Sequence, residues 1–271
     1  MDVVSCFEMD VFGVDCAAFD CHVFFGNNSG CLSSGDGASS CFFGNGFYVL
    51  QSASNAGADA ANNFYWQDYL GSEDYVRIVV AAARKYYAEN GGVKPLKLFI
   101  NDYNLESTWD NNQKAKSLVH WIEKWESDGV TKIDGIGTQM HVAYRANAAD
   151  QQKQEEHVVK MFEILAKSGK LVKVSELDMG YVDESGTTVL TKDMTEEQHK
   201  AMAEYYKFIV KKYFEIIPVA QQYGITQWCA TDAPGAPGDS NWRGGEPVGL
   251  WDSNYNRKHT YAGFADGLAG K

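Results

Sequence analysis

The sequence predicts an α/β fold of the (β/α)8 TIM-barrel type, in which helices connect parallel strands. Three observations favour it. Strand-like and helix-like segments alternate from about residue 62 at a spacing of roughly 40 residues, as expected for a parallel sheet. Each strand-like segment ends in polar residues, and in such barrels the chemistry sits at the carboxyl ends of several strands. No GxGxxG or GxxxxGK[ST] motif follows a strand, which argues against a dinucleotide-binding sheet.

The first half of the alternating region contains two expected helices and two expected strands. Residues 72–89 have the alanine content and apolar spacing of a helix, and residues 95–102 (PLKLFIND) have the pattern of a short buried strand. Residues 111–129 place four large apolar side chains on one helical stripe and end at Gly129, a common stop signal. Residues 132–142 (KIDGIGTQMHV) are the next expected strand.

The second half continues the alternation. Residues 155–170 carry an apolar stripe at helical spacing, and residues 171–178 (LVKVSELD) follow as a strand. Residues 195–217 form a long expected helix, because the TEEQ at its start is a capping box and an apolar stripe follows. The last strand and the closing helix are expected at residues 224–232 and 259–268.

Residues 1–45 do not join this pattern. They are rich in Gly, Ser, Cys and Phe without a steady period, and we interpret them as an insertion or a disordered segment. Five of the six cysteines lie here, but no CxxC pair is present, so no zinc site is expected. No loop has the Asp-x-Asp-x-Asp-Gly spacing of a calcium site. The alternating domain is assigned to residues 46–271.

Charge and composition exclude several function classes. The formal net charge of −12 argues against nucleic acid as a partner and fits a neutral or basic ligand. No apolar run approaches the ~18 residues that a membrane span needs, so no membrane partner is expected. No basic segment precedes an apolar run as in a signal peptide. Aromatic residues make up 13% of the chain, and aromatic faces can stack on sugar rings.

Two carboxylates arrive together at the end of the strand expected over residues 171–178. Glu176 and Asp178 lie two positions apart, so their side chains project from the same face of the strand. His141 ends the preceding expected strand, where it can hydrogen-bond Glu176 and keep it ionised, and Gln139 shares its face. Two facing carboxyl groups are the machinery of glycoside hydrolysis. The alternative is a pair of solvated acids on a surface loop.

Five motifs around these residues resemble glycoside hydrolase family 10, the endo-β-1,4-xylanases. They are LFINDYN (98–104), DGIGTQMHV (134–142), VSELDM (174–179), ITQWCATD (225–232) and LWDSNYNRKHTY (250–261). They occur in the order found in the family, and the resemblance covers roughly residues 46–271, as the C-terminal portion of the family's catalytic domain. It implies a (β/α)8 barrel and hydrolysis with retention at the anomeric carbon by double displacement.

The resemblance also implies roles for individual residues. Glu176 in SELD matches the family's nucleophile, and His141 and Asp178 match the residues that orient it and tune its charge. Tyr103 and Asn104 in NDYN match residues that line the cleft near the scissile bond. The implied sugar-binding residues beside the nucleophile are Gln139, Trp228 and Trp242.

The chain departs from the family at the acid/base. A retaining glycosidase needs a second carboxyl group ~5–5.5 Å from the nucleophile, and the family supplies it in a motif reading WDVVNE. This chain reads MDVVSC there, with Cys6 in place of Glu. Glu8 is a weak substitute, because it would lie ~6–7 Å further along an extended strand. The resemblance begins at the fourth strand, so we expect about strands four to eight of a barrel, with open edges that favour self-association.

The first hypothesis is a family 10 endo-β-1,4-xylanase that acts on xylan or xylo-oligosaccharides, with weak or absent activity in this chain. The alternatives are a non-catalytic xylan-binding remnant and a β-1,4-glucanase of similar barrel type. No cofactor is expected. Family relatives act on polymers outside the cytoplasm, so a secreted or periplasmic location is expected for the parent protein.

Overall fold

The computed structural model describes residues 22–26, 31–33, 39–41, 72, 74–232 and 242–271. The chain divides into two compact units. The first contains residues 1–102 and 113–137, and the second contains residues 103–112 and 138–271. All the expected site residues that the structure describes belong to the second unit.

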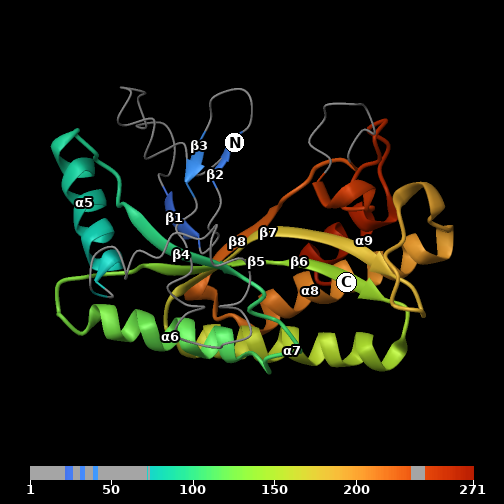
Figure 1. Cartoon of the computed structure of the whole chain (residues 1–271), viewed down its shortest axis with the longest axis horizontal. Coiled ribbons are helices and arrows are strands. Elements are labelled where there is room, and N and C mark those ends of the chain that lie inside the picture. Colours follow the sequence, from blue (N-terminus) through green and yellow to red (C-terminus); the bar gives the residue numbers. More distant parts are fainter. Residues whose placement is uncertain (1–21, 27–30, 34–38, 42–71, 73, 233–241) are drawn as a thin grey trace. The chain divides into compact units, whose positions relative to one another are not determined.

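Beyond its N-terminal segment, the first unit contains two helices and all but the last residues of two strands (Figure 1). They are α5 (Tyr75–Glu89), β4 (Lys97–Tyr103), α6 (Gln113–Glu126) and β5 (Gly135–Gln139), with β5 beside β4 in the sheet. The expected apolar stripe of α6 is confirmed, because Trp121 and Trp125 are almost fully buried. The Trp125 ring meets the ring of Tyr75 from α5 edge to face at 5.8 Å between centroids. This aromatic contact joins the two helices.

The N-terminal segment contributes short strands that the sequence pattern does not indicate. β1 (His22–Gly26) pairs in parallel with β4, while β2 (Cys31–Ser33) and β3 (Ser39–Cys41) form an antiparallel pair. Because these segments lack alternation of apolar and polar residues, the sequence pattern does not predict them as strands. β1 pairs with the backbone groups on the side of β4 that faces away from β5. The boundary at residue 45 lies outside the described residues and stays a prediction.

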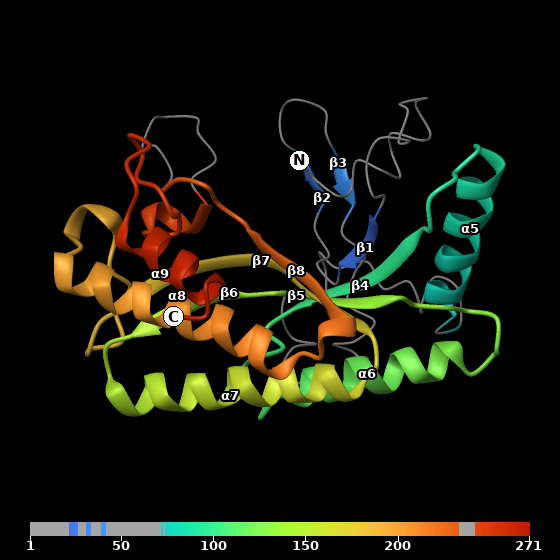
Figure 2. The same cartoon turned by 180° about the vertical axis from the view of Figure 1, so that it is seen from behind.

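The second unit is a parallel sheet with helices packed on it. β7 lies between β6 and β8, and both neighbours run parallel to it. Figures 1 and 2 show α7 and α8 on the same side of these strands from both directions. The elements are β6 (His141–Arg145), α7 (Ala148–Lys167), β7 (Leu171–Val182), α8 (Glu196–Ile216), β8 (Gln222–Gln227) and α9 (His259–Leu268), with the short helices η3 (Thr191–Asp193), η4 (Val219–Gln221) and η5 (Trp242–Gly245) between them.

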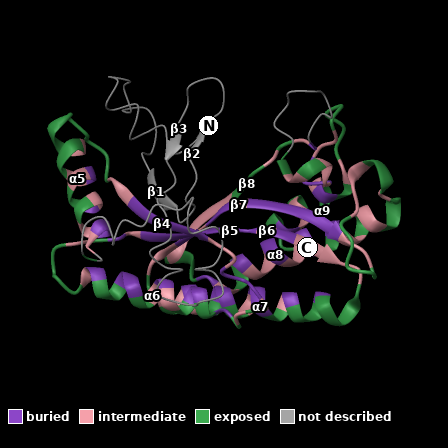
Figure 3. Ribbon diagram, in the orientation of Figure 1, coloured by how far each residue is buried: buried purple, intermediate pink, exposed green. Residues whose placement is uncertain are grey.

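The core of the second unit lies between β7 and the inner faces of α7 and α8, and Figure 3 shows these faces as buried. Helix α8 begins with the expected capping box, in which Thr195 and Gln198 bond each other's backbone N–H groups. Tyr213 of α8 donates its hydroxyl to the Val172 carbonyl of β7 at 2.7 Å, so the buried phenol is satisfied. The strands that carry the site are thereby fixed against the helix layer.

Several boundaries differ from the sequence expectation. The strand expected over 132–142 is two strands, β5 and β6, separated at Met140. Helix α7 starts well before residue 155, because Asn147 caps it by accepting from the amides of Ala149 and Asp150. β7 continues past Asp178 to Val182, whereas β8 ends at Gln227, short of the expected residue 232. In the part of the chain that the structure describes, no helix has the length and apolarity of a membrane span.

Candidate active site

The parallel pairing of β6 with β7 brings the expected catalytic residues together. Its register places His141 opposite Asp178, and Glu176 lies two residues earlier on β7. His141 Nδ1 lies 2.8 Å from Asp178 Oδ2, and Nε2 lies 3.1 Å from Glu176 Oε2. One imidazole ring therefore links the two carboxylates.

Burial and hydrogen bonding set the charge of that ring. Asp178 is fully buried, while the side chain of Glu176 stays 13% exposed. Burial alone would lower the pKa of His141, but the hydrogen bonds to Asp178 and Glu176, together with their charges, raise this pKa to about 9. The ring is therefore protonated at neutral pH, and both of its nitrogens donate. Glu176 thus has a cationic donor on one side and solvent access on the other.

Two tryptophans stand beside His141. Trp228 follows β8 and is 39% exposed, and Trp242 opens η5 and is 36% exposed. The His141 ring lies 6.1 Å from the Trp228 ring and 5.0 Å from the Trp242 ring between centroids. Trp242 is fixed because its indole Nε1 donates to Asp178 Oδ2 at 2.6 Å. Flat, half-exposed aromatic surface thus adjoins the carboxylates.

Arg243 and Glu246 belong to the same group, although the sequence analysis did not select them. Arg243 Nη1 donates to Asp178 Oδ1 at 2.7 Å and to the Val142 carbonyl at 2.8 Å. Its Nη2 donates to Glu246 Oε2 at 2.9 Å. The only hint in the sequence is the string WRGGE (242–246), in which two opposite charges follow Trp242, one of the implied sugar-binding residues.

The remaining expected residues lie at the ends of β4 and β5. Gln139 ends β5 and is buried, with 4% exposure. Tyr103 ends β4, and Asn104 follows it with a left-handed φ of 58°, a backbone conformation that asparagine tolerates. The contacts that define the site come instead from β6, β7, the end of β8, and η5. Glu8, the weak acid/base candidate, lies outside the described residues.

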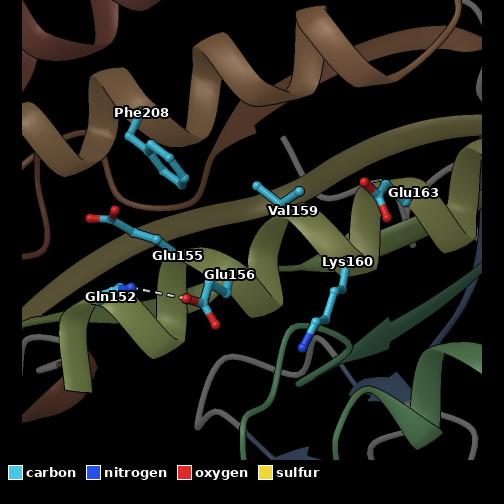
Figure 4. A pocket seen from close by; sticks show the side chains of 7 residues that line it. All are labelled: Gln152, Glu155, Glu156, Val159, Lys160, Glu163 and Phe208. Carbon is cyan, nitrogen blue, oxygen red and sulfur yellow. Dashed lines mark hydrogen bonds between the residues drawn. The ribbon is translucent and has the colours of Figure 1, made fainter. Parts of the chain in front are cut away.

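Two further features bear on ligands. Among the described residues, no group of three or more His, Cys, Asp or Glu side chains could hold a metal ion. A hollow of about 500 Å³ opens between α7 and α8, where Gln152 donates to Glu156 at 3.1 Å (Figure 4). None of the expected site residues lines it, so it is separate from the group around His141. Its lining consists of Gln152, Glu155, Glu156, Val159, Lys160, Glu163 and Phe208.

The geometry around His141 suits nucleophilic attack by a carboxylate on a ligand with a flat apolar face. Glu176 accepts a hydrogen bond from the protonated imidazole and reaches solvent, so it can approach an electrophilic carbon. Trp228 and Trp242 offer faces on which such a ligand can stack.

Comparison with known proteins points in one direction. The model of the family "Glycosyl hydrolase family 10" matches residues 49–267. Endo-beta-1,4-xylanase Xyn10C of Cellvibrio japonicus is 32% identical over 192 residues, which cover 64% of this chain and 28% of that protein.

Solved structures agree with this match. The native xylanase10C structure from the same organism is similar at 29% identity with a TM-score of 0.57, covering 75% of this chain and 41% of that one. Its E385A mutant in complex with xylopentaose is similar at 28% identity with a TM-score of 0.52, covering 69% and 39%. The chain thus spans less than half the length of these relatives. The likeness confirms the TIM-barrel class expected from the alternating strands and helices.

Proposed function

The chain belongs to glycosyl hydrolase family 10, and from that premise we propose that it carries the nucleophile half of a retaining endo-β-1,4-xylanase site. Glu176 is the proposed nucleophile, with His141 and Asp178 as the residues that orient it. The observation that carries the proposal is the imidazole held between the two carboxylates at 2.8 and 3.1 Å.

In the proposed reaction, Glu176 attacks the anomeric carbon of a xylosyl residue while the bond from that carbon to the leaving-group oxygen breaks; the oxygen departs as an anion or takes a proton from solvent. Water then hydrolyses the covalent glycosyl-enzyme ester and frees the Glu176 carboxylate. The protonated ring of His141 donates to one oxygen of Glu176 and so fixes the orientation of this carboxylate. Asp178 fixes the ring from the opposite nitrogen. The nucleophile is therefore charged and oriented before the substrate arrives, which reduces the reorganisation needed for attack.

The proposed substrate is xylan or a xylo-oligosaccharide. Trp228 and Trp242 supply stacking surface for the sugar beside Glu176, and family resemblance adds Gln139, Tyr103 and Asn104 as further contacts. A related structure holds xylopentaose, which supports this substrate class. Rate comparison on xylan and carboxymethylcellulose separates this proposal from a β-1,4-glucanase.

The test is hydrolysis of an aryl β-xylobioside with a good leaving group, with and without azide. Such a substrate does not need a general acid for its first step, and azide can replace water in the second. We expect phenol release that azide accelerates, and we expect Glu176→Gln to abolish it. Glu184→Gln is the matched control, because Glu184 is an exposed carboxylate just beyond β7. Absence of release from a correctly folded chain would refute the proposed function.

A specific observation favours a second candidate, a non-catalytic xylan-binding protein. Cys6 stands where the family has its acid/base glutamate. If xylan binds and no aryl xylobioside is cleaved, this candidate holds. Titration calorimetry with xylopentaose on wild type, Trp228→Ala and Trp242→Ala measures the binding, and both variants should weaken it.

A further inference from the structure

Asp178 is a buried anion whose charge must be balanced inside the protein. Its side chain is 0% exposed, and taking a carboxylate out of water costs several kcal/mol unless it is paired and hydrogen-bonded. Among the described residues, three side chains donate to it: Arg243 to Oδ1, and Trp242 and His141 to Oδ2.

Only one of these three donors carries a permanent charge. The Trp242 indole is neutral, and the His141 ring can lose its proton, whereas an arginine stays charged at every pH the protein meets. Arg243 is therefore the fixed cation beside Asp178, at 2.7 Å. It takes Oδ1 and leaves Oδ2 for His141.

Arg243 is itself held from two sides. The Val142 carbonyl of β6 accepts from Nη1, and Glu246 accepts from Nη2 at 2.9 Å. Its backbone has φ 56°, and Gly244 and Gly245 continue at 64° and 94°, a left-handed run in which glycines carry no steric cost.

The space that this pair needs is left open by a glycine on β7. A Cβ on Gly180 would meet the Glu246 carboxylate and would lie 2.7 Å from Arg243 Nη2. Gly180 thus leaves room for the guanidinium–carboxylate pair over the strand that also carries Asp178.

We propose that Arg243, braced by Glu246, is a positioning residue that pairs with the buried carboxylate of Asp178 and keeps its Oδ2 directed at His141. Through His141 it sets the charge and orientation of Glu176. The catalytic meaning of this arrangement rests on the proposed function, but the effect on His141 is independent of turnover.

Among the described residues, few charged or titratable groups face the series of contacts that runs from Arg243 through Asp178 and His141 to Glu176. His141 faces Glu176 and Asp178 on β7, and Arg243 faces Asp178 and Glu246. Burial raises the pKa of Tyr206 on α8, and it raises that of Cys229 to about 12. Both therefore stay neutral while His141 titrates. Lys173 on β7 faces Glu176 and adds a positive charge at the far end.

The experiment is an NMR titration of the His141 ring in wild type, Arg243→Met and Arg243→Lys. The chain has six histidines, and His141→Gln assigns the resonance. In Arg243→Met, the Asp178 carboxylate should turn away from His141, so the hydrogen bond that raises the pKa of the ring is lost and this pKa should fall by about one unit or more. Arg243→Lys keeps the charge and should restore most of that shift.

The control is Arg257→Met, which removes an exposed arginine of the same unit that lies 4.5 Å from the Tyr261 ring. It should leave the His141 titration unchanged. If circular dichroism shows that Arg243→Met does not fold, Glu246→Gln replaces it, and the pKa of His141 should then fall by a smaller amount. An unchanged or raised pKa of His141 in the folded variants would overturn the proposal.

A kinetic readout separates this proposal from the proposed function. With the aryl xylobioside, Arg243→Met should lower kcat about tenfold or more with little change in KM, because the nucleophile and not the sugar site is disturbed. Equal loss in Arg243→Lys would contradict a charge-based role. If wild type releases no phenol, the proposed function fails while the His141 titration still decides the role of Arg243.

Discussion

At the scale of single residues, His141 decides the charge state of the site. Three carboxylates (Glu176, Asp178 and Glu246) meet two cations, His141 and Arg243. At neutral pH these five side chains together carry one net negative charge, and Lys173, which faces Glu176 from β7, adds one positive charge beside them. Loss of the proton from His141 would add a second negative charge among groups that are mostly buried.

This charge balance predicts a pH dependence of stability. The pKa of His141 is about 9 in the folded protein against an ordinary 6.5, so protonation stabilises the folded state. The contribution is fully present below about pH 6.5 and is lost as the pH rises through 9; it amounts to roughly 3 kcal/mol. Urea denaturation at pH 6 and pH 9.5 measures it. His141→Gln should remove most of the difference, and an equal difference in that variant would place its origin elsewhere.

At the scale of elements, close packing of α8 against α9 gives a prediction in which two effects oppose each other. Gly263 lies inside α9, where alanine would gain about 1 kcal/mol of helix propensity. A Cβ there would meet the Ala203 carbonyl and lie 2.8 Å from Ala203 Cα, both backbone atoms of α8. Because backbone cannot move aside cheaply, the clash should win and Gly263→Ala should lower the free energy of unfolding by about 1–3 kcal/mol.

The measurement is urea denaturation, with Ala262→Gly as the control on the exposed face of α9. That variant should cost about 1 kcal/mol through propensity alone. A more stable Gly263→Ala protein would show that the two helices can separate without cost.

Elements with strong local signals were predictable, and those fixed by distant partners were not. The capping box at Thr195 starts α8 within one residue of expectation, because both of its partners lie within four residues. β1 could not be predicted, because its position depends on pairing with β4, more than 70 residues away in the sequence. The break at Met140 was missed because residues 132–142 have a strand-like pattern with no Pro, Asn or Asp at the break to mark it.

At the scale of the whole molecule, the site residues with local sequence signals were predicted, whereas those fixed by distant partners were missed. Glu176, Asp178 and His141 were found because strand periodicity and family motifs both select them, and the structure brings them together. Arg243 lies 65 residues from Asp178 and reaches it through a left-handed run, for which local periodicity gives no signal. Their roles in catalysis stay predictions.

The last prediction concerns the carboxyl group that the MDVVSC stretch lacks. Cys6→Glu restores the carboxyl group of the family's WDVVNE motif in the MDVVSC stretch. General acid catalysis contributes typically ~10²–10⁴-fold, so xylan hydrolysis should rise by about 10²-fold or more. Cleavage of the activated aryl xylobioside should change little in its first step, because a good leaving group departs without a proton. Reducing-sugar release from xylan measures the first effect and phenol release measures the second.

Cys16→Glu is the matched control, because it adds the same carboxylate elsewhere in the cysteine-rich segment. A rise specific to Cys6→Glu would require residue 6 to come within ~5–5.5 Å of Glu176, the separation of a retaining pair. If xylan hydrolysis stays at the wild-type level while azide-accelerated phenol release persists, the nucleophile half is assembled and residue 6 does not reach it. Glu8→Gln would then test the remaining carboxylate of that stretch, since loss of residual xylan hydrolysis in this variant would assign the proton to Glu8.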